Sequence, residues 1–348
     1  MRLMRTLRPR ARAGDRGGVV TLVAIVLGTG VLMGAGALAV DVGQLHAERD
    51  QLQSGADGAA VAVAQNCVLK PNTCASQQSV ATTYAGLNAN DGTSAASVCG
   101  TMSGLPACGA GVSNLGACIG TAPSTPYAEV RTSTRRTDGG TLLPPSFAGA
   151  LLGEEYHGAT VHACARAVYF YPSTAHGLAI TLSTCEWNKL ALNTEAVIYI
   201  HGTNKGDCPT SNSGWDKPGG FGYLDDDANC EATITLGFAN ADPGSGATNE
   251  CKAAFLQAWT SRKVVYLPVY DYVTGTGTNS KYHIAGFSAF VLTGYRISGS
   301  DEQKSWLTNT VPCKGNDRCL SGYFVSGLLP SASGSGGTFG AKVVKLVG

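Results

Sequence analysis

A short acidic segment in the second half of the chain has the residue types that bind a hard cation. It alternates Asp225, Asp227, Asn229 and Glu231. Carboxylate and amide oxygens are the ligands that calcium prefers. The rest of the EF-hand pattern is missing, because Cys230 stands at the position of the required glycine and Leu236 at that of the bidentate glutamate. A solvated acidic turn is therefore favoured over a calcium site, and we predict neither a bound metal nor a cofactor.

The histidines and the remaining carboxylates form no catalytic pattern. The chain contains neither the G-x-S-x-G nucleophile elbow nor the H-E-x-x-H zinc motif. His201 and His283 lie beside aromatic runs, where a hydrogen-bonded structural role is favoured over that of a general base. The glutamates that only spatial proximity could pair as acid and base are Glu154, Glu155, Glu186 and Glu195. We expect a protein that is not an enzyme.

Cysteine is the one reactive residue type that is abundant. All 12 cysteines follow a long apolar run near the N-terminus, and none has the C-x-x-C or Cys/His spacing of a zinc site. This pattern predicts disulfides formed in an oxidising compartment. Short separations favour two local bridges, Cys67 with Cys74 and Cys313 with Cys319, and the other pairings cannot be read from the sequence.

The composition favours a β-rich fold with a substantial core. Of 348 residues, 44% are hydrophobic, only 14% are charged and 46 are glycine. The formal net charge of +1 provides no overall basic field, so we predict no nucleic-acid partner.

An uncharged run from Val19 to Val40 follows an arginine-rich N-terminus. As a helix it would span about 33 Å, enough for a hydrocarbon core of about 30 Å. The positive-inside rule then places the N-terminus in the cytoplasm and the bulk of the chain outside the cell, with lipid around a single membrane helix. The alternative is a cleaved signal peptide, because Ala37-Leu38-Ala39 has the small-x-small form. Gly30 and Gly34 have the spacing that lets two membrane helices approach closely.

A second helical pattern follows directly after the apolar run. Between Asp41 and Gln65, one narrow seam recurs at steps of three and four residues. Its members are Val42, Leu45, Arg49, Leu52, Ala56, Ala59 and Val63. A seam this narrow does not stabilise an isolated helix, so we expect it to pack on its own domain or on a partner subunit.

The N-terminal segment resembles the TadE/TadG-like proteins of the tight-adherence (Flp) pilus and secretion apparatus. The resemblance rests on the arginine-rich start, the apolar span, A-L-A-V-D-V-G (37–43) and L-Q-S-G-A-D-G-A-A-V-A-V-A (52–64). The positions that match the family are Asp41, Gly43, Arg49, Leu52, Gln53 and Asp57. Gly55 and Gly58 stand where the family more often has alanine, which weakens the helix by about 1 kcal/mol each. The resemblance implies that the N-terminal helix binds other pilus or secretion subunits.

Weaker likenesses extend beyond this segment. G-G-F-G-Y-L (219–224) and H-I-A-G-F-S-A-F (283–290) are similar to the C-terminal region of actinobacterial TadG-related proteins. Gly18 precedes the apolar run, but the fifth residue after it is Val23 and not glutamate, so we expect no cleavage by prepilin peptidase.

We predict an α+β fold, with an N-terminal transmembrane, pilin-like helix followed by a β-rich, disulfide-linked ectodomain. The predicted segments are a basic segment (1–18), a membrane helix (19–40), a stalk helix (41–66), a Cys/Gly/Ser-rich insertion (67–126), a small α/β segment (127–172), a β-rich domain (173–300) and a Gly/Ser-rich C-terminal region (301–348). Within the β-rich domain, the segments 178–184, 196–201, 232–238, 263–272 and 282–297 are predicted strands, and 251–262 is a predicted helix.

Two functions follow from this pattern. The favoured one is a non-catalytic cell-envelope component, anchored in the membrane, that acts in pilus assembly, anchoring or surface adhesion. The alternative is a surface-anchored β domain that binds or hydrolyses carbohydrate and uses the same kind of anchor.

Overall fold

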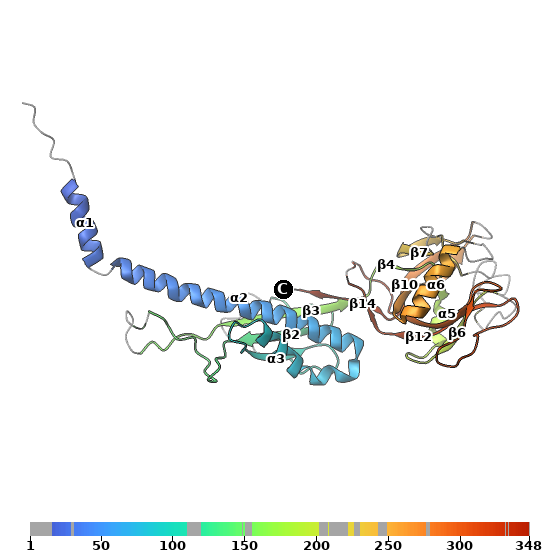
Figure 1. Cartoon of the computed structure of the whole chain (residues 1–348), viewed down its shortest axis with the longest axis horizontal. Coiled ribbons are helices and arrows are strands. Elements are labelled where there is room, and N and C mark those ends of the chain that lie inside the picture. Colours follow the sequence, from blue (N-terminus) through green and yellow to red (C-terminus); the bar gives the residue numbers. More distant parts are fainter. Residues whose placement is uncertain are drawn as a thin grey trace, which may run out of the picture.

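Two helices lead into a β-rich body. In the computed structural model, the described residues are 16–28, 31–109, 120–147, 149, 155–201, 208, 222–225, 230–242, 249–275, 279–330, 332 and 334–347. The first helix, α1 (Arg16–Gly28), is followed by the long helix α2 (Val31–Leu69). Figure 1 shows α1 and the first part of α2 extending away from the body, while the second part of α2 lies along a sheet.

The first unit of the body, here called the proximal unit, is a five-stranded sheet with α2 across one face. Its strands lie in the order β1-β2-β3-β14-β13. Their bounds are β1 (Ala95–Gly100), β2 (Tyr127–Ser133), β3 (His162–Phe170), β13 (Gly327–Leu328) and β14 (Ala341–Leu346). The short helices η1 (Pro71–Ser76) and α3 (Gln78–Leu87) follow α2 and pack beside it.

Small side chains form the interface between α2 and this sheet. The helix buries Ala56, Ala59, Ala60 and Val63 completely, and the facing strands bury residues such as Ala128. Because alanine adds only a methyl group beyond the backbone, the helix can lie close to the sheet along its second part. The alternating pattern of β2 supplies the other half of the contact, since every second side chain of a strand points to the same face.

The second unit, here called the distal unit, is built around one long central strand. Its main sheet has the order β5-β9-β10-β12-β6, and β8 and β11 also pair with β10. The strands are β5 (Leu182–Ser183), β6 (Ala196–His201), β8 (Gly237–Asn240), β9 (Val264–Thr274), β10 (Lys281–Arg296), β11 (Glu302–Gln303) and β12 (Arg318–Val325). A two-stranded sheet joins β4 (Thr174–Leu178) to β7 (Glu231–Thr235). Two helices, α5 (Thr184–Lys189) and α6 (Asn249–Ser261), complete the unit, and Phe255 of α6 lies in its core.

The last strand returns to the first sheet. β14 pairs antiparallel with β3, so β4 to β12 are inserted between two neighbouring strands of the proximal sheet. Figure 1 accordingly shows the C-terminus beside the proximal sheet. The C-terminal region was predicted only as Gly/Ser-rich chain, because K-V-V-K-L (342–346) is too short to reveal a strand whose partner lies about 170 residues earlier.

The observed fold is α+β, with N-terminal helices followed by a β-rich body that contains disulfides. The predicted insertion 67–126 holds more regular structure than expected, namely α3 and β1. The predicted membrane span 19–40 corresponds to α1 and the beginning of α2. In the part of the chain that the structure describes, no helix is both long enough and apolar enough to cross a membrane.

Bridges close short loops throughout the body. The structure joins Cys67 to Cys74 and Cys313 to Cys319, the two local pairs favoured by spacing. Three further bridges link Cys99 to Cys108, Cys185 to Cys208 and Cys230 to Cys251. Among the described cysteines none is free.

Candidate functional site

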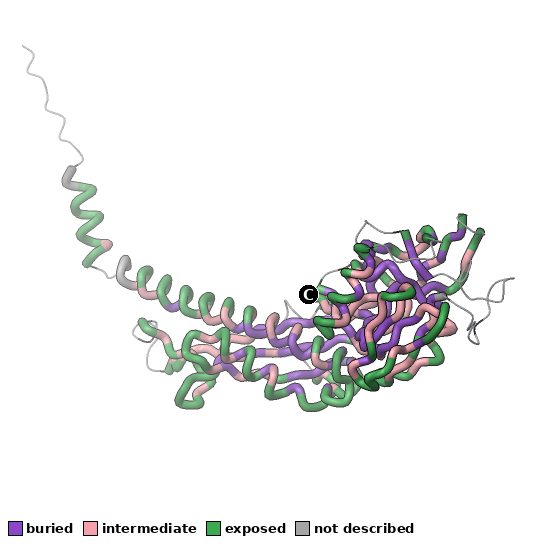
Figure 2. Tube along the Cα trace, turned by 45° about the vertical axis from the view of Figure 1, so that its right-hand side comes forward, coloured by how far each residue is buried: buried purple, intermediate pink, exposed green. Residues whose placement is uncertain are grey.

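The N-terminal helices present apolar side chains that the body does not cover. Leu22 is 65% exposed and Leu27 is 58% exposed on α1, and Leu38 is 54% exposed on α2. Figure 2 shows α1 and the first part of α2 almost entirely exposed, whereas buried residues begin where α2 meets the sheet. Because large exposed apolar surfaces are rare on isolated soluble proteins, this surface is a candidate site for lipid or for other helices. We call residues 16–28 and 31–45 the free arm.

Asp41 marks the point where the free arm first touches the body. Its side chain is only 7% exposed, and its carboxylate accepts hydrogen bonds from two backbone N–H groups. The donors are Ser146, at 2.7 Å, and Phe147, at 3.1 Å. Gln44 adds a hydrogen bond from its Nε2 to the Ser146 hydroxyl, at 2.7 Å. An anion satisfied by backbone N–H groups holds the segment before Gly149 against the helix, because charge-assisted hydrogen bonds are stronger than neutral ones.

Leu52, Gln53 and Asp57 fasten the next part of α2 to the sheet. The Leu52 side chain is 3% exposed, and its carbonyl accepts a hydrogen bond of 2.9 Å from the Thr132 hydroxyl on β2. The Gln53 side-chain amide donates both to Asp57 Oδ1, at 2.9 Å, and to the Cys164 carbonyl on β3, at 3.0 Å. These three family-matching positions therefore act within the chain, by fixing the helix on β2 and β3.

Gly43 and Arg49 do not take part in this docking. A methyl group at Gly43 would meet no atom of the described residues within 4 Å. Arg49 is exposed and has no hydrogen bond or ion pair with the described residues, although the sequence seam placed it among the packed positions. The seam predicts burial correctly from Leu52 onward. Before Leu52 the helix extends past the end of the sheet, so the same face of the helix is not covered. Gly34 lies near the start of α2 and is half-buried, and Gly30 lies outside the described residues.

Gly55 and Gly58 have different environments within the packed part of α2. A Cβ atom at Gly55 would lie 3.1 Å from Ala85 Cα and 3.2 Å from its carbonyl oxygen, both on α3. A Cβ atom at Gly58 would be 3.6 Å from the Tyr84 ring, an ordinary contact. The helix runs through both glycines to Leu69, so the close approach of α3 accounts for Gly55.

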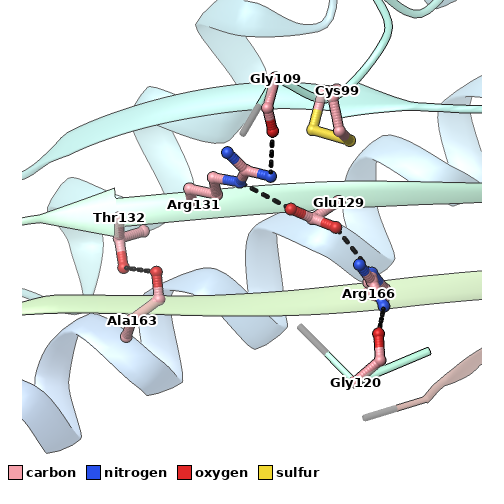
Figure 3. Close-up of polar contacts among 9 residues, drawn as sticks. Cys99, Gly109, Gly120, Glu129, Arg131, Thr132, Ala163 and Arg166 are labelled. Carbon is pink, nitrogen blue, oxygen red and sulfur yellow. Dashed lines mark hydrogen bonds and ion pairs between the residues drawn. A yellow bond between two sulfur atoms is a disulfide. The ribbon is translucent and has the colours of Figure 1, made fainter. Parts of the chain in front are cut away.

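A buried ion cluster lies on the sheet face opposite α2. Glu129 Oε1 accepts from Arg131 Nε at 2.6 Å, and Glu129 Oε2 accepts from Arg166 Nε at 2.6 Å (Figure 3). The outer guanidinium N–H groups donate to the carbonyls of Gly109 and Gly120. Glu129 is 0% exposed because the loops after β1 cover that face.

This cluster offers no metal site. Glu129 lies within 4.8 Å of the sulfurs of Cys99 and Cys108, a combination that could bind a cation. Both sulfurs are joined in a disulfide, however, and both oxygens of Glu129 accept from arginine. The cluster is a structural clamp between strands, and only the order Glu129-x-Arg131 could have suggested it from sequence.

The other chemical candidates lie apart from one another. Of the acidic segment, Asp225 and Glu231 are described, whereas Asp227 and Asn229 lie outside the described residues. Glu231 lies 3.4 Å from His176 on the surface, and Glu195 accepts from the hydroxyls of Thr293 and Ser305. Glu154 is outside the described residues, and Glu186 closes the N-terminal cap of α5 with Ser183.

The comparisons with known proteins place one family on the helical segment. Residues 18–66 match the family model described as putative Flp pilus-assembly TadE/G-like. The match covers the free arm and the packed part of α2 together. Neither a curated protein nor a solved structure matches the chain.

Proposed function

We propose that this protein is a non-catalytic, membrane-anchored component of a Flp/Tad-type pilus or secretion apparatus. The observation that carries the proposal is the division of the TadE/G-like segment: its second part is docked on the body, and its first part is apolar and exposed. A docked helix fixes the body relative to its anchor, while an uncovered apolar helix requires lipid or neighbouring helices as its partner.

The proposed orientation has the N-terminus in the cytoplasm and the disulfide-bonded body outside the cell. Six arginines precede the apolar run, against the single acid Asp15, which fits retention of the N-terminus on the cytoplasmic side. The disulfides of the body fit an oxidising exterior. Pilus assembly, anchoring of the assembly and surface adhesion are the roles that agree with this arrangement.

The proposal is tested by a charge placed in the free arm. Leu27→Arg puts a cation where the apolar run is predicted to cross the bilayer centre, at a cost of about 2.5–3.5 kcal/mol for insertion. We expect loss of the variant from the membrane fraction and loss of co-purification with other Flp/Tad subunits in mild detergent. The matched control is Leu307→Arg, because Leu307 is 53% exposed on the distal unit.

A second variant separates assembly from anchoring. Gly43→Leu adds bulk at a position where an added Cβ atom meets no described atom of this chain within 4 Å. If another subunit approaches there, the variant stays in the membrane but loses its partners. Retention of all partners by both Leu27→Arg and Gly43→Leu would contradict the proposed function.

A further inference from the structure

The distal unit carries an exposed group of aromatic rings on the outer face of its sheet. Phe238 on β8 is 55% exposed and Tyr272 on β9 is 45% exposed. His283 on β10 is paired with both of them, across from Phe238 on one side and Tyr272 on the other. Three neighbouring strands thus each contribute one ring to the same face.

The rings are held in a defined arrangement. The rings of Tyr272 and His283 are stacked, with centroids 4.4 Å apart, and the Phe238 ring meets the His283 ring edge-on at 5.3 Å. Asp271 Oδ1 lies 2.7 Å from His283 Nδ1. Because a carboxylate only accepts, this contact places a hydrogen on Nδ1 and fixes the imidazole ring. The group is therefore preorganised, and the described residues leave part of it exposed.

A polar pocket lies two residue pairs farther along the same strands. Asn240 and Lys281 are paired directly, two residues from Phe238 and His283, and side chains two apart on a strand share a face. They line a pocket of about 390 Å³ together with Asp225, Asp242, Asn279 and Ser280. This volume is within the range of small-molecule sites.

Ser280, one of the residues that line the pocket, carries a buried hydroxyl. Ser280 is 1% exposed, and its hydroxyl oxygen has no hydrogen-bond partner among the described residues. A buried hydroxyl without a partner is costly, and native structures rarely leave one unless water or a ligand supplies the bond.

We infer that the aromatic rings and the adjacent pocket form a binding site for a neutral or amino-bearing saccharide. A pyranose ring has a face of C–H groups, which pack on the electron-rich face of an aromatic ring, and a rim of hydroxyls, which need donors and acceptors together. The rings of Phe238 and Tyr272 provide the aromatic surface for the C–H face. The carboxylates, amides and hydroxyl of the pocket provide the donors and acceptors for the sugar hydroxyls.

The charges of the site decide between ligand classes. Among the described residues at this face, the carboxylates of Asp225 and Asp271 face one cation, Lys281. Because the carboxylates outnumber the ammonium group, a phosphorylated or uronic-acid ligand is disfavoured. A neutral hexose or hexosamine chain meets no such penalty. The inference does not depend on the proposed assembly role, since the site lies on the distal unit and the free arm is not part of it.

The test is binding of defined oligosaccharides to the full chain in mild detergent. Calorimetry with the tetramer of N-acetylglucosamine, with cellotetraose and with anionic tetragalacturonate should show binding of at least one neutral probe and none of the anionic one. Phe238→Ala and Tyr272→Ala should each weaken the neutral probe about tenfold, which corresponds to about 1.4 kcal/mol. Both side chains are exposed, so the variants are expected to stay folded, and thermal melting checks this.

The matched control is Leu192→Ala, because Leu192 is 52% exposed elsewhere on the distal unit. This control should bind as the unmodified chain does. The inference is overturned if none of the three probes binds, if only tetragalacturonate binds, or if the two aromatic variants bind as tightly as Leu192→Ala. Co-purification with pilus subunits should be unchanged in all three variants, so loss of saccharide binding and loss of assembly are separate results.

Discussion

At the scale of single residues, the strongest electrostatic interaction among the described residues is that of Glu129 with two arginines. Its side chain is 1% exposed, and those of Arg166 and Arg131 are 7% and 17% exposed. Glu129→Gln would leave two guanidinium groups without their carboxylate in a site that water reaches poorly. Removal of one member of a buried ion pair costs about 3–5 kcal/mol. We expect a loss of this size in the free energy of unfolding, measured by urea denaturation.

The comparison variant for this change is Glu231→Gln. Glu231 pairs with His176 on the surface, where the two side chains are 46% and 58% exposed. Exposed pairs contribute about 0–1 kcal/mol, so the variant should be almost neutral. Equal effects of the two substitutions would show that the Glu129 cluster is not a structural clamp.

Glu48 of α2 gives a prediction that depends on pH. Burial raises its pKa above the ordinary value of 4.5, a hydrogen bond with Thr134 opposes this shift, and the charge of Asp91 adds to it. Because the folded pKa is above the unfolded one, the stability linked to this group is complete below the unfolded pKa and is lost as pH rises through the folded pKa. Glu48→Gln removes this loss of stability at high pH, because glutamine does not ionise. The variant should therefore be more stable than the unmodified chain at neutral pH, with the difference vanishing well below pH 4.5, as measured by urea denaturation at both values. A difference that persists at low pH would assign the effect to packing instead of to ionisation.

At the scale of elements, the packing of α2 on α3 makes the two glycines of the helix respond differently. Alanine favours a helix by about 1 kcal/mol over glycine. At Gly58 the added methyl makes an ordinary contact, so Gly58→Ala should stabilise by about that amount and raise the melting temperature by about 2–4 °C. At Gly55 the methyl would press on the backbone of Ala85, which has no flexible side chain that could move away.

Gly55→Ala should therefore stabilise the protein less than Gly58→Ala does, or destabilise it. Thermal melting of both variants measures this difference. A rise of equal size in the two variants would mean that α3 moves freely relative to α2. The prediction also separates backbone propensity from packing, because the two substitutions are chemically identical and lie three residues apart on one helix.

The elements that the sequence predicts well are those with a local period. The strand at 196–201 and the helix at 251–262 agree with the structure within two residues, because alternation and helical spacing are visible in short windows. The burial of Glu129 could not be predicted, since it depends on loops contributed by residues 101–109 and 120. The exposure of Arg49 was missed for a related reason: a helical seam records which face is apolar but not where its partner sheet ends.

The same distinction applies to the candidate sites. Asp41 and Gln53 were singled out by resemblance alone, and their hydrogen bonds to Ser146 and Cys164 join positions more than 100 residues apart. The ring group of the distal unit was not predicted either. Phe238, Tyr272 and His283 come from three separate strands, and only the register of β8 and β9 on β10 brings them together.

At the scale of the whole molecule, β14 is the strand that couples the two units. Its residues Ala341 and Val343 are buried in the core that includes Phe287 of the distal unit, while Val344 packs against the core beneath α2. The strand also completes the proximal sheet by pairing with β3. Force applied to the distal unit would thus be transmitted through β3 and β14 to the docked helix, as the proposed anchoring by the N-terminal arm requires.

A chain that ends at Gly340 tests this coupling. It lacks β14, so β3 loses its partner in the proximal sheet. The core that includes Phe287 loses the buried Val343, and the core beneath α2 loses the half-buried Val344. A fully buried valine contributes about 1.5–3 kcal/mol. We expect calorimetry to show two separate unfolding transitions, with the proximal one at lower temperature, in place of a single cooperative transition. The control is a chain that ends at Leu346, which keeps β14 and loses only the hydrogen bond from Val347 to the Arg166 carbonyl among the described contacts. If the chain ending at Gly340 still melts in one transition at the temperature of this control, the units are coupled through some other contact, and β14 is only an edge addition to the sheet.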